Sequence, residues 1–353
     1  MAGDTVSGGG RRSRTTDAKL SEIGFDESAP LLEVEDLQVE FRTRDGVASA
    51  VNGTTFSVAA GETLGILGES GCGKSVTAQA IMGILDSPPA FIAGGSVKLR
   101  GVDLLSLPEE TRRRVRANRV AMVFQDALSS LNPVFTVGRQ LGELFRRHRG
   151  YTKAEARAEA VRLLDLVGIP AAADRVSDFP HQFSGGMRQR VMIAMSLALD
   201  PDVLIADEPT TALDVTVQAQ IMKLLADLQA ERNMGLILIT HDMGVVADVA
   251  DKICVMYAGK IVERADVYSI YRNPAHPYTK ALLESIPRLD RKGQQLASIE
   301  GLPPMLTRLP AGCSFNPRCA IARERCITDE PPLYDIGDGR QTACHYHEEV
   351  LGS

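Results

Sequence analysis

Residues 68 to 75 read Gly68-Glu69-Ser70-Gly71-Cys72-Gly73-Lys74-Ser75, and this stretch decides the fold of the chain. Two glycines separated by four residues precede Lys and Ser, the pattern of a phosphate-binding loop. The loop follows a mostly apolar run at 63–67 and precedes helical spacing at 76–85, which predicts a strand, a loop and a helix. Glycine lets the backbone curl so that its N–H groups point at phosphate oxygens near the positive end of the helix. Lys74 is predicted to bridge the outer phosphates of a nucleotide, and Ser75 to hold magnesium.

Apolar segments and helical patterns alternate along most of the chain. Strands are expected at 31–41, 54–58, 63–67, 203–207, 236–240 and 253–257, and helices at 76–85, 107–120, 152–167, 186–199 and 215–232. Strands separated by helices predict a parallel sheet with helices packed on it. The predicted fold class is therefore α/β, with a P-loop NTPase core.

The strand predicted at 203–207 ends in two carboxylates, Asp207 and Glu208. Beside bound phosphates, Asp207 is placed to hold the magnesium shell, and Glu208 to polarise a water for in-line attack. Acidic residues also end many strands that have no catalytic role. The assignment therefore depends on the motifs around this pair.

A second glycine-containing motif lies just upstream of that strand. Residues 183–190 read Phe-Ser-Gly-Gly-Met-Arg-Gln-Arg, where small residues begin a helix and form an anion site without a lysine. This motif resembles the signature sequence of the ABC ATPase family. The resemblance implies that Ser184, Gly185 and Gly186, with Gln189, contact a nucleotide bound on an opposing subunit. Hydrolysis would then require a dimer.

Other positions match the same family in order along the chain. Gln125 resembles the family's glutamine loop, which contacts magnesium and the attacking water and moves with the membrane domain. His241 resembles the switch histidine that reads the terminal phosphate, because an imidazole N–H can donate to that charge. Asp214, in Ala-Leu-Asp at 212–214, is a further position that matches the family and lies after the acidic strand. Phe41 is the candidate for stacking on adenine, with a place in the apolar core as the alternative.

Two segments narrow the resemblance to one branch of the family. Residues 273–279, Asn-Pro-Ala-His-Pro-Tyr-Thr, and 128–133, Leu-Ser-Ser-Leu-Asn-Pro, are similar to ATPases of peptide and nickel importers. The resemblance implies uptake of oligopeptides or dipeptides, with nickel or oligosaccharide uptake as alternatives. It also implies a second, paralogous ATPase subunit, two transmembrane permeases and, indirectly, an extracytoplasmic substrate-binding protein. The chain would then act as a peripheral subunit on the cytoplasmic face of the cell membrane.

Six cysteines occur, and four of them crowd the carboxy-terminal end of the chain: Cys313, Cys319, Cys326 and Cys344. Their gaps are wider than those of zinc ribbons, yet four thiolates can still converge on one centre. The set resembles the tail cysteines of peptide-importer ATPases, some of which hold an iron–sulfur cluster. The resemblance therefore implies a [4Fe-4S] site. Zn2+, with His345 or His347 as a nitrogen ligand, and unliganded thiols are the alternatives.

Size and charge set the domain organisation and the expected partners. The chain has 353 residues and a net charge of −6, which argues against a nucleic-acid partner. Two basic clusters, 112–119 and 146–149, are expected to be solvated helix faces. We expect a disordered tail at 1–30, an ATPase domain at 31–285 with a helical subdomain at about 105–200, and a module carrying the four cysteines at 286–353.

A soluble ABC protein that acts on DNA or ribosomes is the main rival interpretation. Repair proteins of that kind usually insert a long coiled coil between the phosphate loop and the signature, and translation factors carry two cassettes. This chain has one cassette and no sustained heptads between the two motifs. Transport is therefore the favoured prediction.

Overall fold

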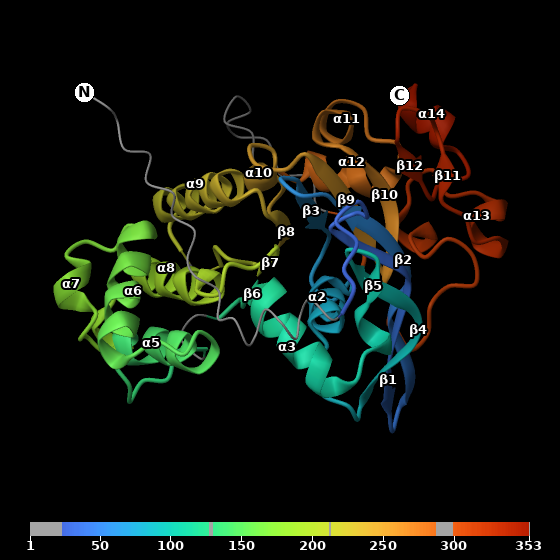
Figure 1. Cartoon of the computed structure of the whole chain (residues 1–353). Coiled ribbons are helices and arrows are strands. Elements are labelled where there is room, and N and C mark those ends of the chain that lie inside the picture. Colours follow the sequence, from blue (N-terminus) through green and yellow to red (C-terminus); the bar gives the residue numbers. More distant parts are fainter. Residues whose placement is uncertain (1–22, 127–129, 212, 287–298, 353) are drawn as a thin grey trace. The chain divides into compact units, whose positions relative to one another are not determined.

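A computed structural model describes residues 23–126, 130–211, 213–286 and 299–352. They fall into two compact units, one within 128–200 and a larger one formed by 26–127 together with 201–353. The larger unit contains both sheets and the carboxy-terminal tail, and the smaller unit is helical (Figure 1). No helix in these described ranges is both long and apolar enough to cross a bilayer.

The main sheet of the larger unit has eight strands in the order β11-β12-β10-β9-β3-β8-β7-β6. Its strands are β3 (Thr63–Leu67), β6 (Val120–Val123), β7 (Val203–Asp207), β8 (Gly235–Thr240), β9 (Lys252–Tyr257), β10 (Lys260–Asp266), β11 (Tyr334–Asp335) and β12 (Gln341–Thr342). The five strands from β9 to β6 run parallel. Every residue of β3, β7 and β8 is buried, as expected for strands covered on both faces.

The prediction of a parallel sheet holds for the five strands from β9 to β6 and is wrong at one end of the sheet. β10 is antiparallel to β9, and β12 is antiparallel to both β10 and β11. Only Ala258 and Gly259 connect β9 to β10, and both have positive φ, at 48° and 82°. A two-residue loop with positive φ at both positions makes a tight hairpin, which forces the strands antiparallel. The sheet is therefore mixed.

A second, antiparallel sheet has the order β2-β1-β4-β5. It comprises β1 (Leu32–Thr43), β2 (Gly46–Val58), β4 (Ala90–Leu99) and β5 (Val102–Asp103). The strands predicted at 31–41 and 54–58 correspond to β1 and to the second half of β2. Sequence patterns missed β4, where Gly94 and Gly95 interrupt the apolar alternation.

The larger unit contains the helices α2 (Lys74–Met82), α3 (Glu109–Arg119), α9 (Val215–Arg232), α10 (Met243–Val246), α11 (Val267–Arg272) and α12 (Pro277–Glu284). Three of these, α2, α3 and α9, are predicted from the sequence, and the three short helices α10, α11 and α12 are not. α9 has the predicted bounds. α2 starts earlier than predicted and ends at Gly83, whose φ of 59° closes the last turn.

The smaller unit consists of α5 (Val137–His148), α6 (Lys153–Leu166), α7 (Ala172–Arg175) and α8 (Gly185–Leu197). A capping box between Thr152 and Glu155 begins α6. The basic cluster at the end of α5 is not simply solvated, because Arg149 is nearly buried and its Nη2 donates to the carbonyl of Leu199 at 2.8 Å. α3, which falls inside the predicted subdomain of 105–200, groups with the larger unit.

The tail is built from very short elements beside β10: η3 (Asn316–Arg318), α13 (Glu324–Thr328), β11, β12 and α14 (His347–Leu351) (Figure 1, red). The segment that precedes the tail is attached to Glu263 of β10, which is fully buried. This carboxylate accepts from the backbone N–H groups of Ala275 and His276 at 2.6 and 3.0 Å. Residues 273–279 therefore wrap around β10, and burial lowers the pKa of His276 to about 4, so its ring is neutral.

Candidate nucleotide site

The predicted site residues of the larger unit gather at the carboxyl ends of four adjacent parallel strands. The phosphate loop follows β3, and His241 follows β8. Glu208 follows β7, and Gln125 lies two residues beyond β6. Because parallel strands end at the same side of a sheet, residues up to 173 positions apart along the chain meet there.

The glycines of the phosphate loop are required by its geometry. Gly68, Gly71 and Gly73 have φ values of 152°, 80° and 109°. A Cβ atom on Gly68 would lie 2.2 Å from the carbonyl oxygen of Met256, and one on Gly73 would lie 2.4 Å from that of Ala50. Both contacts involve backbone atoms, which cannot move aside cheaply. The loop therefore curls tightly against two strands.

Lys74 and Ser75 begin α2 and point back into the loop and toward β7. Lys74 is 4% exposed, and its ammonium donates to the carbonyl oxygens of Gly68 and Glu69 at 2.7 and 3.0 Å. Ser75 Oγ donates to Asp207 Oδ1 at 3.0 Å. A hydroxyl and a carboxylate side by side are the hard oxygen ligands that Mg2+ prefers. Burial raises the pKa of Asp207, partly offset by the Ser75 hydrogen bond, and a divalent cation would favour the ionised form.

Glu208 lies within hydrogen-bond distance of both other predicted catalytic residues, Gln125 and His241. Its carboxylate accepts from Gln125 Nε2 at 2.9 Å and from Thr211 Oγ1 at 2.9 Å, and His241 Nδ1 lies 3.2 Å away. Burial alone would raise the pKa of Glu208, but the His241 and Thr211 hydrogen bonds outweigh it, so the pKa lies below its usual value. Its backbone is held at a φ of 45°, an uncommon conformation for a residue with a side chain. The carboxylate is thus ionised and fixed.

Thr211 is the neighbour of Glu208 that sequence reasoning missed. A threonine three residues after an acidic strand end carries no signal of its own, and only the turn after β7 brings its hydroxyl to the carboxylate. Ala212, next to it, lies outside the described residues, as do Leu128 and Ser129 of the segment after Gln125.

The remaining predicted residues have well-defined local positions. Ser184 caps α8 by accepting from Met187 N, and Gly185 and Gly186 form the first turn of that helix in the smaller unit. Gln189 is 4% exposed, and its Nε2 has no hydrogen-bond partner among the residues that the structure describes. Asp214 caps α9 by accepting from Val217 N at 3.0 Å. Phe41 is partly exposed in β1. Their contacts with nucleotide stay predictions.

The four tail cysteines line one small cavity, together with His276, His345 and other residues. Burial raises the pKa of Cys313 to about 11 and that of Cys344 to about 12, so these thiols are protonated at neutral pH. Within the described ranges, no group of three or more His, Cys, Asp or Glu side chains is arranged to hold a metal ion. Both ring nitrogens of His345 are engaged, Nδ1 with Tyr334 and Nε2 with the carbonyl of Asp329.

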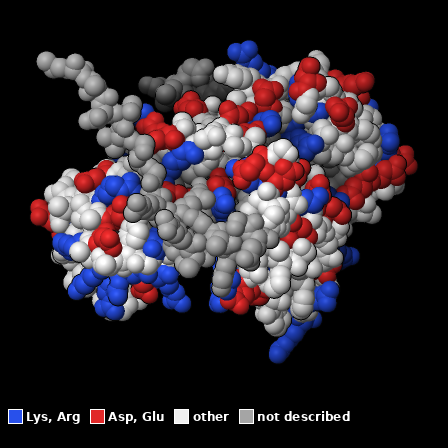
Figure 2. Space-filling model, viewed as in Figure 1, with Lys and Arg blue, Asp and Glu red and all other residues white. Residues whose placement is uncertain are grey.

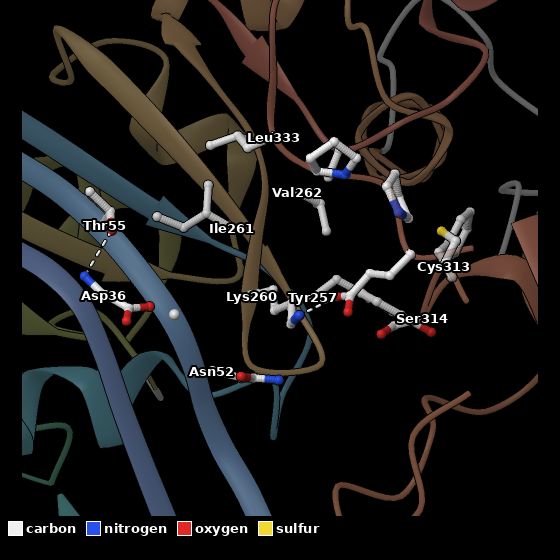
Figure 3. A pocket seen from close by; sticks show the side chains of 16 residues that line it. Asp36, Asn52, Thr55, Tyr257, Lys260, Ile261, Val262, Cys313, Ser314 and Leu333 are labelled. Atoms are coloured by element: carbon white, nitrogen blue, oxygen red, sulfur yellow. Dashed lines mark hydrogen bonds and ion pairs between the residues drawn. The ribbon is translucent and has the colours of Figure 1, made fainter. Parts of the chain in front are cut away.

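A larger cavity of about 500 Å3 lies between the second sheet, the β9–β10 hairpin and the tail (Figure 3). Asp36 and Thr55 line it from the sheet, and Ser314 and Cys313 from the tail. Lys260 of β10 forms an ion pair with Glu330 of the tail at this cavity. Core and tail are thus separated by open space at this cavity, although β12 pairs with β10 elsewhere.

Two family models match the chain. A model described as "ABC transporter" matches residues 51–211, and one described as "Oligopeptide/dipeptide transporter, C-terminal region" matches 262–326. The oligopeptide transport ATP-binding protein OppD of Salmonella typhimurium is 53% identical over 321 residues, covering 91% of this chain and 95% of the relative. The chain belongs to the ATP-binding subunits of the oligopeptide/dipeptide ABC transporter family.

Further relatives of this family and solved structures agree with that assignment. The dipeptide transport ATP-binding protein DppD of Escherichia coli is 49% identical over 322 residues, covering 91% of this chain and 98% of the relative. The dimeric bacterial ABC transporter cassette MJ0796 is 25% identical with a TM-score of 0.60, covering 67% of this chain and 98% of that chain. cbiO1 from Clostridium perfringens is 28% identical with a TM-score of 0.60, covering 69% and 91%. The predicted ABC ATPase fold is therefore confirmed.

Proposed function

We propose that this chain binds magnesium ATP at residues 68–75 and hydrolyses it to drive the import of oligopeptides or dipeptides. The observation that carries the proposal is near-full-length similarity, at 53% and 49% identity, to proteins named for oligopeptide and dipeptide transport. The convergence of Gln125, Glu208 and His241 beside the phosphate loop supports the hydrolytic part.

Each residue of the site has a distinct task in the proposed hydrolysis. The loop N–H groups and Lys74 bind the outer phosphates, and Ser75 and Asp207 hold the magnesium ion, which would neutralise phosphate charge. Glu208 accepts a proton from a water molecule while the oxygen of that water attacks the terminal phosphorus of ATP. The bond between this phosphorus and the oxygen that leaves with ADP breaks. Gln125 and His241 orient that water and contact the terminal phosphate.

Hydrolysis further requires a partner in this proposal. Ser184, Gly185 and Gly186 would contact ATP bound to a second, paralogous ATPase subunit, and the reverse contact would complete the site described above. Closure of the pair would act on two transmembrane permeases at the cytoplasmic face of the membrane. An extracytoplasmic binding protein would deliver the peptide to those permeases.

Reconstitution tests the transport function. Proteoliposomes that contain this chain, the paralogous ATPase and both permeases, with the binding protein outside, should accumulate a labelled tri- or tetrapeptide only with internal ATP. Labelled nickel and an oligosaccharide serve as competing cargoes in the same vesicles. Uptake of either one without peptide uptake would replace the peptide assignment while leaving the ATPase intact.

The distribution of surface charge helps to distinguish a transporter subunit from a soluble ABC protein that acts on DNA or ribosomes. On the face shown in Figure 2, basic and acidic side chains are interspersed over the larger unit. Nucleic-acid-binding proteins instead concentrate Lys and Arg along a track that follows phosphates. On this face of the larger unit, the described Lys and Arg side chains do not form such a track.

For the tail, we propose that Cys313, Cys319, Cys326 and Cys344 hold a [4Fe-4S] cluster, with a single Zn2+ ion as the alternative. Supporting this, all four thiols line the same cavity. A zinc ion needs ligands about 2.3 Å from one point, whereas a cluster accepts more widely spaced thiolates, one at each iron. The engaged ring of His345 weighs against its use as a zinc ligand. The cluster would cross-link a tail that has little regular structure.

Metal analysis tests the cluster. Protein purified without oxygen should contain about four irons and four sulfides per chain and absorb visible light near 400 nm, as thiolate-bound clusters do. Cys344→Ser should lose most of this absorption, whereas Cys254→Ser, a buried thiol of β9, should keep it. One zinc per chain would decide for the alternative, and a metal-free protein with native stability would refute both.

A further inference from the structure

Arg318 of the tail reaches across 249 sequence positions to the phosphate loop. Its Nη1 lies 2.6 Å from Glu69 Oε2, and its Nη2 lies 2.9 Å from Glu69 Oε1. Two parallel N–H···O bonds of this kind form the strongest and most directional carboxylate pair available to a protein. The Arg318 side chain is 3% exposed and the Glu69 side chain 26%, so water reaches this pair mainly from the Glu69 side.

Arg318 is also held in place by contacts other than its pair with Glu69. Its Nε donates to the carbonyl of Glu300 at 3.0 Å, and its Nη2 also donates to the carbonyl of Ile299 at 3.3 Å. Tyr257 of β9 accepts from Nη1 at 3.4 Å. The guanidinium therefore uses both tail and core contacts to hold its orientation.

Glu69 is fixed at its backbone as well as its carboxylate. Its N–H donates to the hydroxyl of the fully buried Tyr278 at 2.9 Å. Its carbonyl accepts from Lys74 Nζ at 3.0 Å and from Cys72 N at 3.3 Å. The position of Glu69 thus sets the position of the lysine that is proposed to bind the outer phosphates.

The negative charge of Glu69 gives a second reason why its pairing with Arg318 would favour ATP binding. A carboxylate in a phosphate loop repels the triphosphate that the loop receives, with an energy that grows as water is excluded. Arg318 neutralises that carboxylate and draws it toward the tail. An unpaired Glu69 would both free the loop and oppose the ligand.

We propose that Arg318 is a positioning residue for ATP binding: through Glu69 it holds the phosphate loop in its curled form and cancels the one acidic charge within residues 68–75. ATP affinity in this chain therefore depends on the tail. The inference rests on the proposed function, because it concerns the same nucleotide site.

A double-mutant cycle tests this mechanism. Arg318→Met, Glu69→Gln and the combined variant are compared with the wild type by titration with a fluorescent ATP analogue and by steady-state hydrolysis with the partner ATPase. Arg318→Met should raise the Kd and the KM for ATP about tenfold or more and change kcat less than about threefold, since charge-assisted pairs of this type contribute on that scale. Adding Glu69→Gln should recover part of the lost affinity, because it removes the repelling charge.

Two further ion pairs of the tail provide matched controls. Lys260→Met breaks the other tail-to-core pair, with Glu330, and Arg323→Met breaks a pair within the tail, with Glu349. Both variants should keep the wild-type Kd within about twofold. Arg318→Lys, which keeps the charge but not the two-pronged geometry, should lie between wild type and Arg318→Met, and it replaces Arg318→Met if that variant fails to fold.

The outcomes of these experiments distinguish a failure of the Arg318 proposal from a failure of the proposed ATPase function. Unchanged ATP affinity in a stably folded Arg318→Met or Arg318→Lys would overturn the positioning role. Equal losses in Arg318→Met and Lys260→Met would also overturn it, because the effect would then reflect general attachment of the tail. A wild-type chain that binds no ATP would instead refute the proposed function itself.

Discussion

Glu208→Gln is expected to bind ATP with near-normal affinity and to hydrolyse it at least about a hundredfold more slowly. Glutamine keeps the shape of the side chain but cannot accept a proton from water at neutral pH. The hydrogen bonds that fix Glu208 also lower its pKa, so the wild type stays ionised and active until the pH falls well into the acidic range. The variant therefore isolates the proton-accepting step.

The measurement pairs nucleotide titration with single-turnover hydrolysis. Glu35→Gln, on the exposed part of β1, makes the same chemical change far from the site and should hydrolyse ATP normally. Because the closed dimer would no longer be released by hydrolysis, Glu208→Gln with ATP and the partner ATPase should elute as a stable dimer. Near-normal turnover would remove Glu208 from the role of base.

Gly73→Ala is expected to weaken ATP binding at least about a hundredfold, because the added Cβ cannot be accommodated without moving the loop or β2. It would lie 2.4 Å from the carbonyl oxygen of Ala50. Positive φ adds a cost of about 1–2 kcal/mol for any L-residue, but the contact with strand backbone is the larger effect. The N–H groups of the loop would then no longer converge on one point.

Gly71→Ala provides the matched control for this prediction. Gly71 also has a positive φ, 80°, but a Cβ there would meet nothing within 4 Å. It should weaken binding by about tenfold at most, which reports the backbone strain alone. Thermal unfolding without nucleotide checks that both variants fold. Equal affinities in the two variants would show that the contact with Ala50 is unimportant.

The parts of the fold that the sequence predicts correctly are those that are determined by residues close together in the chain. β3 and β7 have the expected bounds because short, mostly apolar runs that lead into a glycine or an acidic residue suit a strand buried on both faces. α9 has the expected bounds because Asp214 caps its start and Asn233, with a φ of 51°, ends it. The phosphate loop belongs to the same class in part, because its glycine and lysine spacing predicts a curled loop, whereas its contact with Arg318 depends on the tail.

The features that sequence could not predict depend on contacts between distant residues. β10 is not among the expected strands, and the hairpin at Ala258 and Gly259 determines its antiparallel direction. Glu69 and Arg318 are each ordinary surface-type residues in the sequence, and nothing in their spacing links them. The same holds for Tyr278 and the N–H of Glu69.

The two residues of β12 have a consequence for chains that end early. They pair with Glu263 and Arg264 and so cover the outer side of β10. A product truncated soon after Cys326 would leave backbone N–H and C=O groups unpaired at this edge of β10, a template on which other copies can add. Such a product is expected to aggregate even if its ATP site still forms, so the last residues of this chain also protect its solubility.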